Sequence, residues 1–189
     1  MANTGITYPG TSANNTAIGT YAWNNPGNAT ADDGVNTTAR GPTGTNQISN
    51  YLRATNFGFS IPTGSNIDGI LVEIERRREN ANNGTEHTVS LVKGGTVSGD
   101  NKADTATNMP TTMTNKSFGS SSDLWGLSFT VADINASDFG VVFSVSMTRP
   151  GFKSFNDGIV DFIRITVHYT EVAGGSPQMH QMMMAGGLM

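Results

Sequence analysis

The sequence contains no cysteine among its 189 residues, and only 14% of the residues are charged. The absence of cysteine excludes disulfide bonds, thiolate metal ligands and cysteine nucleophiles. The net charge of −4 provides no basic surface for phosphate contacts, so we expect no binding to nucleic acid. No apolar run approaches the ~20 residues that span a bilayer, so we also expect no membrane partner.

Residues 1–10, MANTGITYPG, have neither the basic start nor the apolar centre of a secretory signal, which predicts a protein made in a cytoplasm. Hydrophobic residues make up 36% of the chain, and Asn, Thr, Ser and Gly replace the missing charged residues. These polar and small residues favour turns and solvent-facing strand positions and disfavour helix interiors. The composition therefore predicts an all-β fold.

The clearest pattern lies between Leu52 and Arg78, where two strand-like segments flank a proline-glycine turn. In the second segment Ile70, Val72 and Ile74 alternate with more polar neighbours. Alternation with a period of two, interrupted by a turn, is typical of half-buried antiparallel strands. We interpret this segment as scaffold.

Comparable patterns predict further strands along the chain. Turn signals at 80–85 (NANNGT) and 155–158 (FNDG) separate strands, and Thr130 followed by Asp133 indicates a capped helical turn. One strand is expected within Ile48–Ile61, with a bulge near Gly58, and further strands at Ile67–Glu79, Glu86–Val92, Phe139–Met147 and Ile159–Tyr169. The long polar stretch 94–118 is expected either to be a functional loop or to contain a short strand at Thr96–Ser98. The strands together predict an antiparallel two-sheet β-sandwich, jelly-roll-like or immunoglobulin-like, with extended N-terminal and C-terminal segments.

The last strand is expected to divide its side chains between two faces by simple alternation. One face holds Ile159, Ile163, Ile165, Val167 and Tyr169, interrupted by Asp161, and the other holds Val160, Phe162, Arg164, Thr166 and His168.

We divide the chain into an irregular N-terminal arm (1–46), a β-sandwich domain (47–172) and a Gly/Met-rich C-terminal tail (173–189). Methionine is flexible and suits adaptable binding surfaces, although glycine-rich chain ends are also commonly disordered. Trp23 is expected either to anchor a loop that closes the sandwich or to contact a neighbouring subunit. The candidate partner-binding residues are Tyr8, Tyr21, Trp23, Met179, Met182, Met183, Met184 and Met189.

No group of residues matches a known catalytic or metal-binding arrangement. Glu73 and Glu75 share a strand face and resemble a glycosidase pair, but neighbouring arginines make a surface charge ladder the better interpretation. Calcium ligation by residues 100–104 or 156–158 is a weaker alternative, since neither segment follows the EF-hand pattern. His87, His168 and His180 lack ligand spacing, so we expect no enzyme activity, no cofactor and no metal.

Several segments together resemble a group of tailed-bacteriophage and prophage virion proteins. The resemblance covers residues 23–170 and implies a viral structural β-sandwich without catalytic residues. The segments are Trp23–Gly34 (WNNPGNATADDG), Ala54–Pro62 (ATNFGFSIP), Ile67–Arg77 (IDGILVEIERR), Val92–Gly95 (VKGG), Ser122–Val142 (SDLWGLSFTVADINASDFGVV) and Val160–Thr170 (VDFIRITVHYT).

The resemblance and the lack of a catalytic group favour a capsid decoration or cement protein that bridges capsomers. Its expected location is the virion, and its expected partners are the major capsid protein or other virion proteins and further copies of itself, in a trimer. One alternative is a glycan-binding module of a tail fibre or baseplate that uses Trp125 and Phe118. Another is a tail or neck structural subunit.

Overall fold

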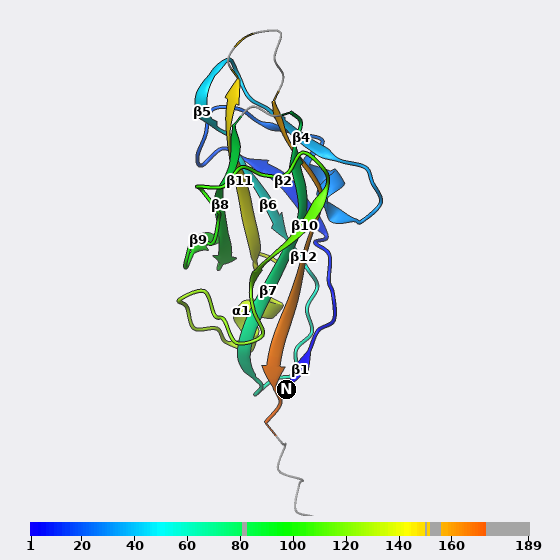
Figure 1. Ribbon diagram of the computed structural model, residues 1–189. Coiled ribbons are helices and arrows are strands. Elements are labelled where there is room, and N and C mark those ends of the chain that lie inside the picture. Colours follow the sequence, from blue (N-terminus) through cyan, green and yellow to red (C-terminus); the bar gives the residue numbers. More distant parts are fainter. Residues whose placement is uncertain (81–82, 150, 152–155, 173–189) are drawn as a thin grey trace, which may run out of the picture.

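Two antiparallel β-sheets of six strands each pack face to face and form a β-sandwich, which confirms the predicted fold class (Figure 1). The computed structural model describes residues 1–80, 83–149, 151 and 156–172. Sheet A has the order β10-β7-β12-β4-β3, with β1 also paired to β12, and sheet B has the order β2-β6-β11-β8-β9, with β5 also paired to β11.

The strands of sheet A are β1 (Ala2–Asn3), β3 (Trp23–Asn24), β4 (Thr37–Arg40), β7 (Asn66–Arg78), β10 (Thr114–Gly119) and β12 (Asp157–Thr170). The strands of sheet B are β2 (Thr11–Asn15), β5 (Gly44–Ile48), β6 (Tyr51–Thr55), β8 (Gly84–Lys93), β9 (Thr96–Ser98) and β11 (Gly140–Arg149). A 3-10 helix, η1 (Pro26–Thr30), and a short α-helix, α1 (Val131–Asn135), complete the secondary structure of the described residues.

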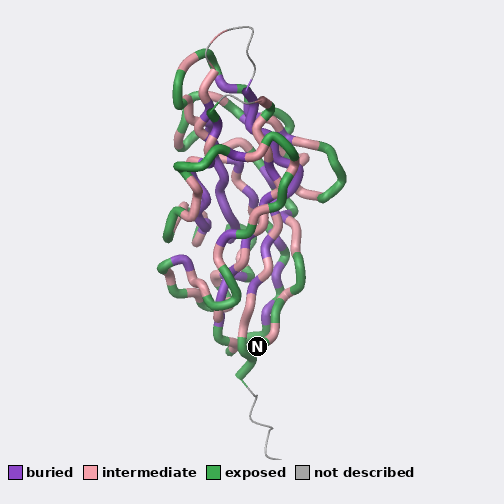
Figure 2. Tube along the Cα trace, viewed as in Figure 1, coloured by how far each residue is buried: buried purple, intermediate pink, exposed green. Residues whose placement is uncertain are grey.

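The core lies between the sheets, where alternate side chains of the long central strands meet. Figure 2 shows that the buried residues are concentrated along the central strands. On β7, Ile70, Val72 and Ile74 are fully buried, as the alternation predicts. Phe143 of β11 and the two tryptophans belong to the same apolar cluster. Burying one large apolar side chain stabilises a fold by about 1.5–3 kcal/mol, so this cluster dominates the stability of the sandwich.

On the edge of β12 that faces away from β7, the two ends of the strand pair with different strands. Its first residues pair with β4, Val160 opposite Thr37, and its last residues pair with β1, Tyr169 opposite Ala2. The N-terminus and the last described residues therefore lie at one end of the sandwich, which we call the terminal end (Figure 1).

A β-bulge in β12 makes the predicted division of its side chains wrong at the start of the strand. Val160 lies opposite Arg76 and Ile163 lies opposite Ile74, so two residues of β12, Asp161 and Phe162, face one residue of β7. An extra residue shifts the alternation by one position. Val160 consequently joins the core between the sheets, although simple alternation put it on the other face.

The strand expected within Ile48–Ile61 is present as β6, and the chain leaves the strand conformation after it, where Asn56 and Gly58 adopt positive φ angles of 58° and 70°. The turn expected at 155–158 is wrong in its described part, since Asp157 and Gly158 begin β12. Residue 155 lies outside the described residues.

The N-terminal 46 residues contribute to both sheets, whereas the sequence predicted an irregular arm. β1, β3 and β4 extend sheet A, β2 lies at the edge of sheet B, and β5 begins at Gly44. These strands are short and polar, so they carry no apolar alternation that would reveal them. The predicted tail, residues 173–189, lies outside the described residues.

Of the two alternatives for the polar stretch 94–118, the short strand is present as β9. Thr130 caps α1 as expected: its side chain accepts a hydrogen bond from the Asp133 amide, and the Asp133 carboxylate accepts one from the Thr130 amide. Among the described residues, no helix has the length and apolarity needed to span a membrane.

Candidate functional site

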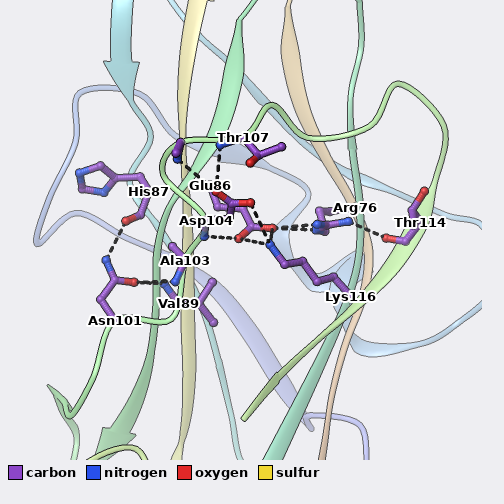
Figure 3. Close-up of polar contacts among 11 residues, drawn as sticks. Arg76, Glu86, His87, Val89, Asn101, Ala103, Asp104, Thr107, Thr114 and Lys116 are labelled. Atoms are coloured by element: carbon purple, nitrogen blue, oxygen red, sulfur yellow. Dashed lines mark hydrogen bonds and ion pairs between the residues drawn. The ribbon is translucent and has the colours of Figure 1, made fainter.

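The densest polar network of the described residues surrounds Glu86, which is 1% exposed on β8 (Figure 3). Arg76 of β7 donates to Glu86 Oε1 from Nε at 3.1 Å and from Nη2 at 2.8 Å. The ammonium group of Lys116 lies 3.0 Å from both carboxylate oxygens, and the amide of Asp104 donates to Oε2 at 2.7 Å. The network thus joins the two sheets and holds the 99–113 segment against them.

The charges of this network are balanced and its hydrogen-bonding groups are occupied. The Arg76 side chain also donates from Nη1 to the Thr114 carbonyl at 3.0 Å. The backbone amide of Thr107 holds the pKa of Asp104 below its usual range, and the Ala106 amide adds to this effect. Both carboxylate oxygens of Glu86 already accept hydrogen bonds, from Arg76, Lys116 and the Asp104 amide, so neither oxygen is free to bind a substrate.

An open hollow of about 310 Å³ lies beside the network, lined by Arg76, Glu86, Lys116, Asp104 and other residues. It has polar walls but offers a substrate no unpaired acid or base from these four residues, because they already bind one another. The arrangement suits structural support better than catalysis.

His87 and Ser144 are brought together although sequence spacing gave no sign of it. Nδ1 of His87 lies 3.2 Å from the Ser144 hydroxyl and 2.9 Å from the Thr88 hydroxyl. Burial lowers the pKa of His87. Ser144 has no solvent exposure, so its hydroxyl cannot reach a substrate as a nucleophile.

A second polar cluster lies on the outer face of sheet A, around the bulge of β12. Single carboxylate oxygens of Asp32, Glu75 and Asp161 all lie within 4.8 Å of one another. Asp32 follows η1, Glu75 lies on β7, and Asp161 is one of the two bulged residues of β12. We call these three residues the acidic cluster.

The only cation that the described contacts place beside the acidic cluster is already engaged. Arg164 donates to Glu73 from Nε at 3.0 Å and from Nη2 at 3.2 Å, and its Nη1 lies 3.8 Å from Asp32. The Arg164 guanidinium lowers the pKa of Glu73. The three carboxylates of the acidic cluster therefore carry more negative charge than the Arg164 guanidinium can balance.

The electrostatic effect of this excess appears in the two inner carboxyls. Burial raises the pKa of Glu75, and the neighbouring Asp161 raises it further. Burial likewise raises the pKa of Asp161, with contributions from Asp32 and Asp33. Two full charges 4.8 Å apart repel by about 3.5 kcal/mol at an effective dielectric constant of about 20, so the cluster favours uptake of positive charge.

The three predicted aromatic contact residues are largely engaged within the chain. Trp23 is 3% exposed and donates from Nε1 to the Asn50 carbonyl at 2.9 Å, as expected for an anchor residue. The Tyr21 hydroxyl donates to the Gln47 carbonyl at 3.2 Å, and burial raises its pKa. The Tyr8 ring packs edge-on against Phe162. A role of the three in a subunit contact stays a prediction.

The five methionines predicted to contact partners, Met179, Met182, Met183, Met184 and Met189, lie outside the described residues.

The aromatic residues proposed for glycan binding are not available for stacking. Trp125 has no solvent exposure and donates from Nε1 to the Ile70 carbonyl at 2.9 Å. Phe118 is 4% exposed. A buried ring cannot stack on a sugar, so these residues do not support the glycan-binding alternative.

The other candidate acids have partners that were not foreseen in detail. Glu73 pairs with Arg164 as the charge-ladder interpretation predicted, but Glu75 turns to the acidic cluster. Of the weaker calcium candidates, Asn101 accepts hydrogen bonds from the Val89 and Ala103 amides, and Asp157 pairs with Arg40 at 2.9 Å.

Comparison with known proteins does not assign the chain to a family. No family model matches the sequence, and no curated protein matches it significantly. The residues themselves therefore carry the functional interpretation.

Proposed function

We propose that the chain is a non-enzymatic structural subunit of a phage virion, a capsid decoration protein that attaches through the terminal end of its sandwich. The resemblance of residues 23–170 to virion proteins supports the virion location. The structural observation that carries the proposal is the distribution of exposed apolar side chains.

Four large hydrophobic residues are strongly exposed among the described residues, and three of them lie at or near the terminal end. Met1 precedes β1 and is 76% exposed, Val172 follows β12 and is 60% exposed, and Ile6 is 55% exposed just before the Thr7–Ile165 bridge. The fourth, Val35, lies beside the first residues of β4. Exposed apolar side chains that gather at one end of a soluble domain favour contact with a partner there.

The polar sites support a structural role in preference to an enzymatic one. The Glu86 carboxylate is already paired with Arg76 and Lys116, and the Ser144 hydroxyl is fully buried. A small contact surface at one end of each subunit is sufficient for a decoration protein, because a closed trimer multiplies a modest affinity into high avidity.

The test combines oligomeric state with binding to undecorated capsids. The purified protein is sized by light scattering and then sedimented with capsids that lack it. We expect a trimer that loads onto capsids, and we expect loading to fall at least tenfold in the double variant Ile6→Ser, Val172→Ser. Val35→Ser is the matched control, since Val35 is 53% exposed but lies away from the terminal end, and it should load normally.

Deleting residues 174–189 tests the methionine-rich segment separately. The shortened chain should fold with unchanged circular dichroism but load onto capsids less completely. If the double variant Ile6→Ser, Val172→Ser loads onto capsids as well as the control Val35→Ser, attachment through the terminal end is contradicted. A monomer that ignores capsids but binds phage tails or bacterial surface glycan would contradict the decoration role and favour one of the tail alternatives.

A further inference from the structure

The bulge of β12 buries a carboxylate oxygen that has no hydrogen-bond partner in the part of the chain that the structure describes. Asp161 is 3% exposed, and its Oδ1 accepts no hydrogen bond from the described residues. Its other oxygen, Oδ2, accepts a hydrogen bond from the Gly34 amide at 3.3 Å. A buried, unpaired carboxylate oxygen is costly, and such groups in folded proteins usually bind a donor, a water or an ion.

The surroundings of this oxygen are rich in oxygen atoms and poor in donors. Carboxylate oxygens of Asp32 and Glu75 complete the acidic cluster. Asn36, the residue before β4, has a buried amide oxygen that is also without a hydrogen-bond partner among the described residues. Since Thr37 pairs with Val160, Asn36 lies next to Asp161 in the register of the two strands.

We propose that Asp32, Glu75 and Asp161 bind a divalent cation, with calcium preferred, at the bulge of β12. Calcium takes six to eight oxygen ligands at about 2.3–2.6 Å and tolerates irregular geometry. An ion with ligands at these distances can bridge oxygens up to about 4.6–5.2 Å apart, which accommodates the spacing within the acidic cluster. Magnesium requires a smaller octahedral shell at about 2.0–2.1 Å and retains more water.

The bound ion ties the loop after η1 to sheet A. Asp32 comes from this loop, whereas Glu75 and Asp161 come from adjacent strands. The Gly34 amide already joins the loop to Asp161, and the Asp33 carboxylate accepts a hydrogen bond from the Val35 amide within the loop. The ion supplies the positive charge that Arg164, occupied by Glu73, does not supply.

The test is calcium binding by the full purified chain, measured by isothermal titration and by urea unfolding in EDTA, 10 mM CaCl₂ or 10 mM MgCl₂. A dissociation constant of about 0.1–1 mM, typical of weak calcium modules, would raise the folded-to-unfolded ratio about 10- to 100-fold at 10 mM calcium. Magnesium should raise it less than threefold.

The variants Glu75→Gln and Asp161→Asn should abolish the calcium response while the chain remains folded in EDTA, because each retains the shape of the side chain. Glu79→Gln is the control: Glu79 is an exposed carboxylate just after the end of β7 and does not belong to the acidic cluster, so this variant should retain the response. Two different cluster variants keep the test valid if one of them fails to fold.

A wild-type chain that does not respond to calcium would overturn the proposal, as would a response that persists in both cluster variants. An equal response to magnesium would overturn the preference for calcium. If the wild-type chain ignores both ions but becomes more stable in mild acid, the cluster takes up a proton instead. None of these outcomes depends on capsid binding, so they separate the cation site from the proposed virion function.

Discussion

Replacing Glu86 by glutamine tests how far the buried network between the sheets stabilises the sandwich. The substitution keeps the size of the side chain but removes the negative charge that faces Arg76 and Lys116. Arg76 is 5% exposed, so its charge would remain buried without its main partner. Removing one partner of a buried ion pair costs about 3–5 kcal/mol.

Substitutions of the residues around Glu86 should lower the unfolding free energy by different amounts. Lys116→Met should cost about 1 kcal/mol or less, because the lysine side chain is 30% exposed and Glu86 keeps Arg76. The double variant Arg76→Met, Glu86→Gln should cost about 0.5–3 kcal/mol less than the sum of its single variants, since both remove the same interaction. Exposed Glu79→Gln is the control and should change stability by less than about 0.5 kcal/mol.

Urea unfolding at pH 7, followed by tryptophan fluorescence and circular dichroism, measures these differences. Both tryptophans are buried, so fluorescence reports the loss of the core. In a chain of this length the Glu86→Gln effect corresponds to a melting temperature lowered by about 6–20 °C. A Glu86→Gln chain within 1 kcal/mol of wild type, or additive single and double variants, would refute a coupled network between the sheets.

Three further changes have defined outcomes. Thr130→Ala removes the capping box of α1 and should lower the unfolding free energy by about 0.5–2 kcal/mol in urea titrations; an unchanged midpoint would show that the cap contributes nothing. Gly140→Ala places a methyl group 1.9 Å from the Ala54 carbonyl oxygen and should cost more than about 3 kcal/mol or prevent soluble expression, whereas Gly27→Ala, with open space around it, should be harmless. Burial raises the pKa of Asp161, so protonation favours the folded state, and this stability is lost as the pH rises through that pKa. In EDTA, the stability of wild type relative to Asp161→Asn should therefore fall as the pH rises above about 4, and a rise would contradict the assignment.

The central strands could be predicted from the sequence because apolar and polar residues alternate along them in the same way as buried and exposed side chains. On β7 the apolar residues Ile70, Val72 and Ile74 face the core, as the pattern indicates. Strands β2 to β5 could not be predicted in this way, since they are short and polar and are ordered by pairing with strands elsewhere in the chain. Local sequence does not encode such pairing, because it depends on residues far away in the chain.

The candidate sites depended even more on information that a sequence does not display. The sequence predicts a surface charge ladder in which Arg76 is one of the arginines, yet Arg76 points inward and pairs with Glu86, as its 5% exposure shows. The acidic cluster combines residues from a loop and two strands, and it exists because the bulge displaces Asp161 from regular alternation. No spacing rule relates residues 32, 75 and 161, so only the fold brings them together.

The pairing of β1 with the last residues of β12 has a consequence for how the chain folds during synthesis. Ala2 leaves the ribosome well before its partner Tyr169, which lies 167 residues later in the sequence. At about 5–20 residues per second, the first strand waits roughly 10–30 s for the strand that completes its ladder. Contacts of such long sequence separation also slow folding. A nascent chain therefore exposes an unfinished edge of sheet A until β12 has been synthesised, and only then can both partners of β12, β1 and β7, be joined in one sheet.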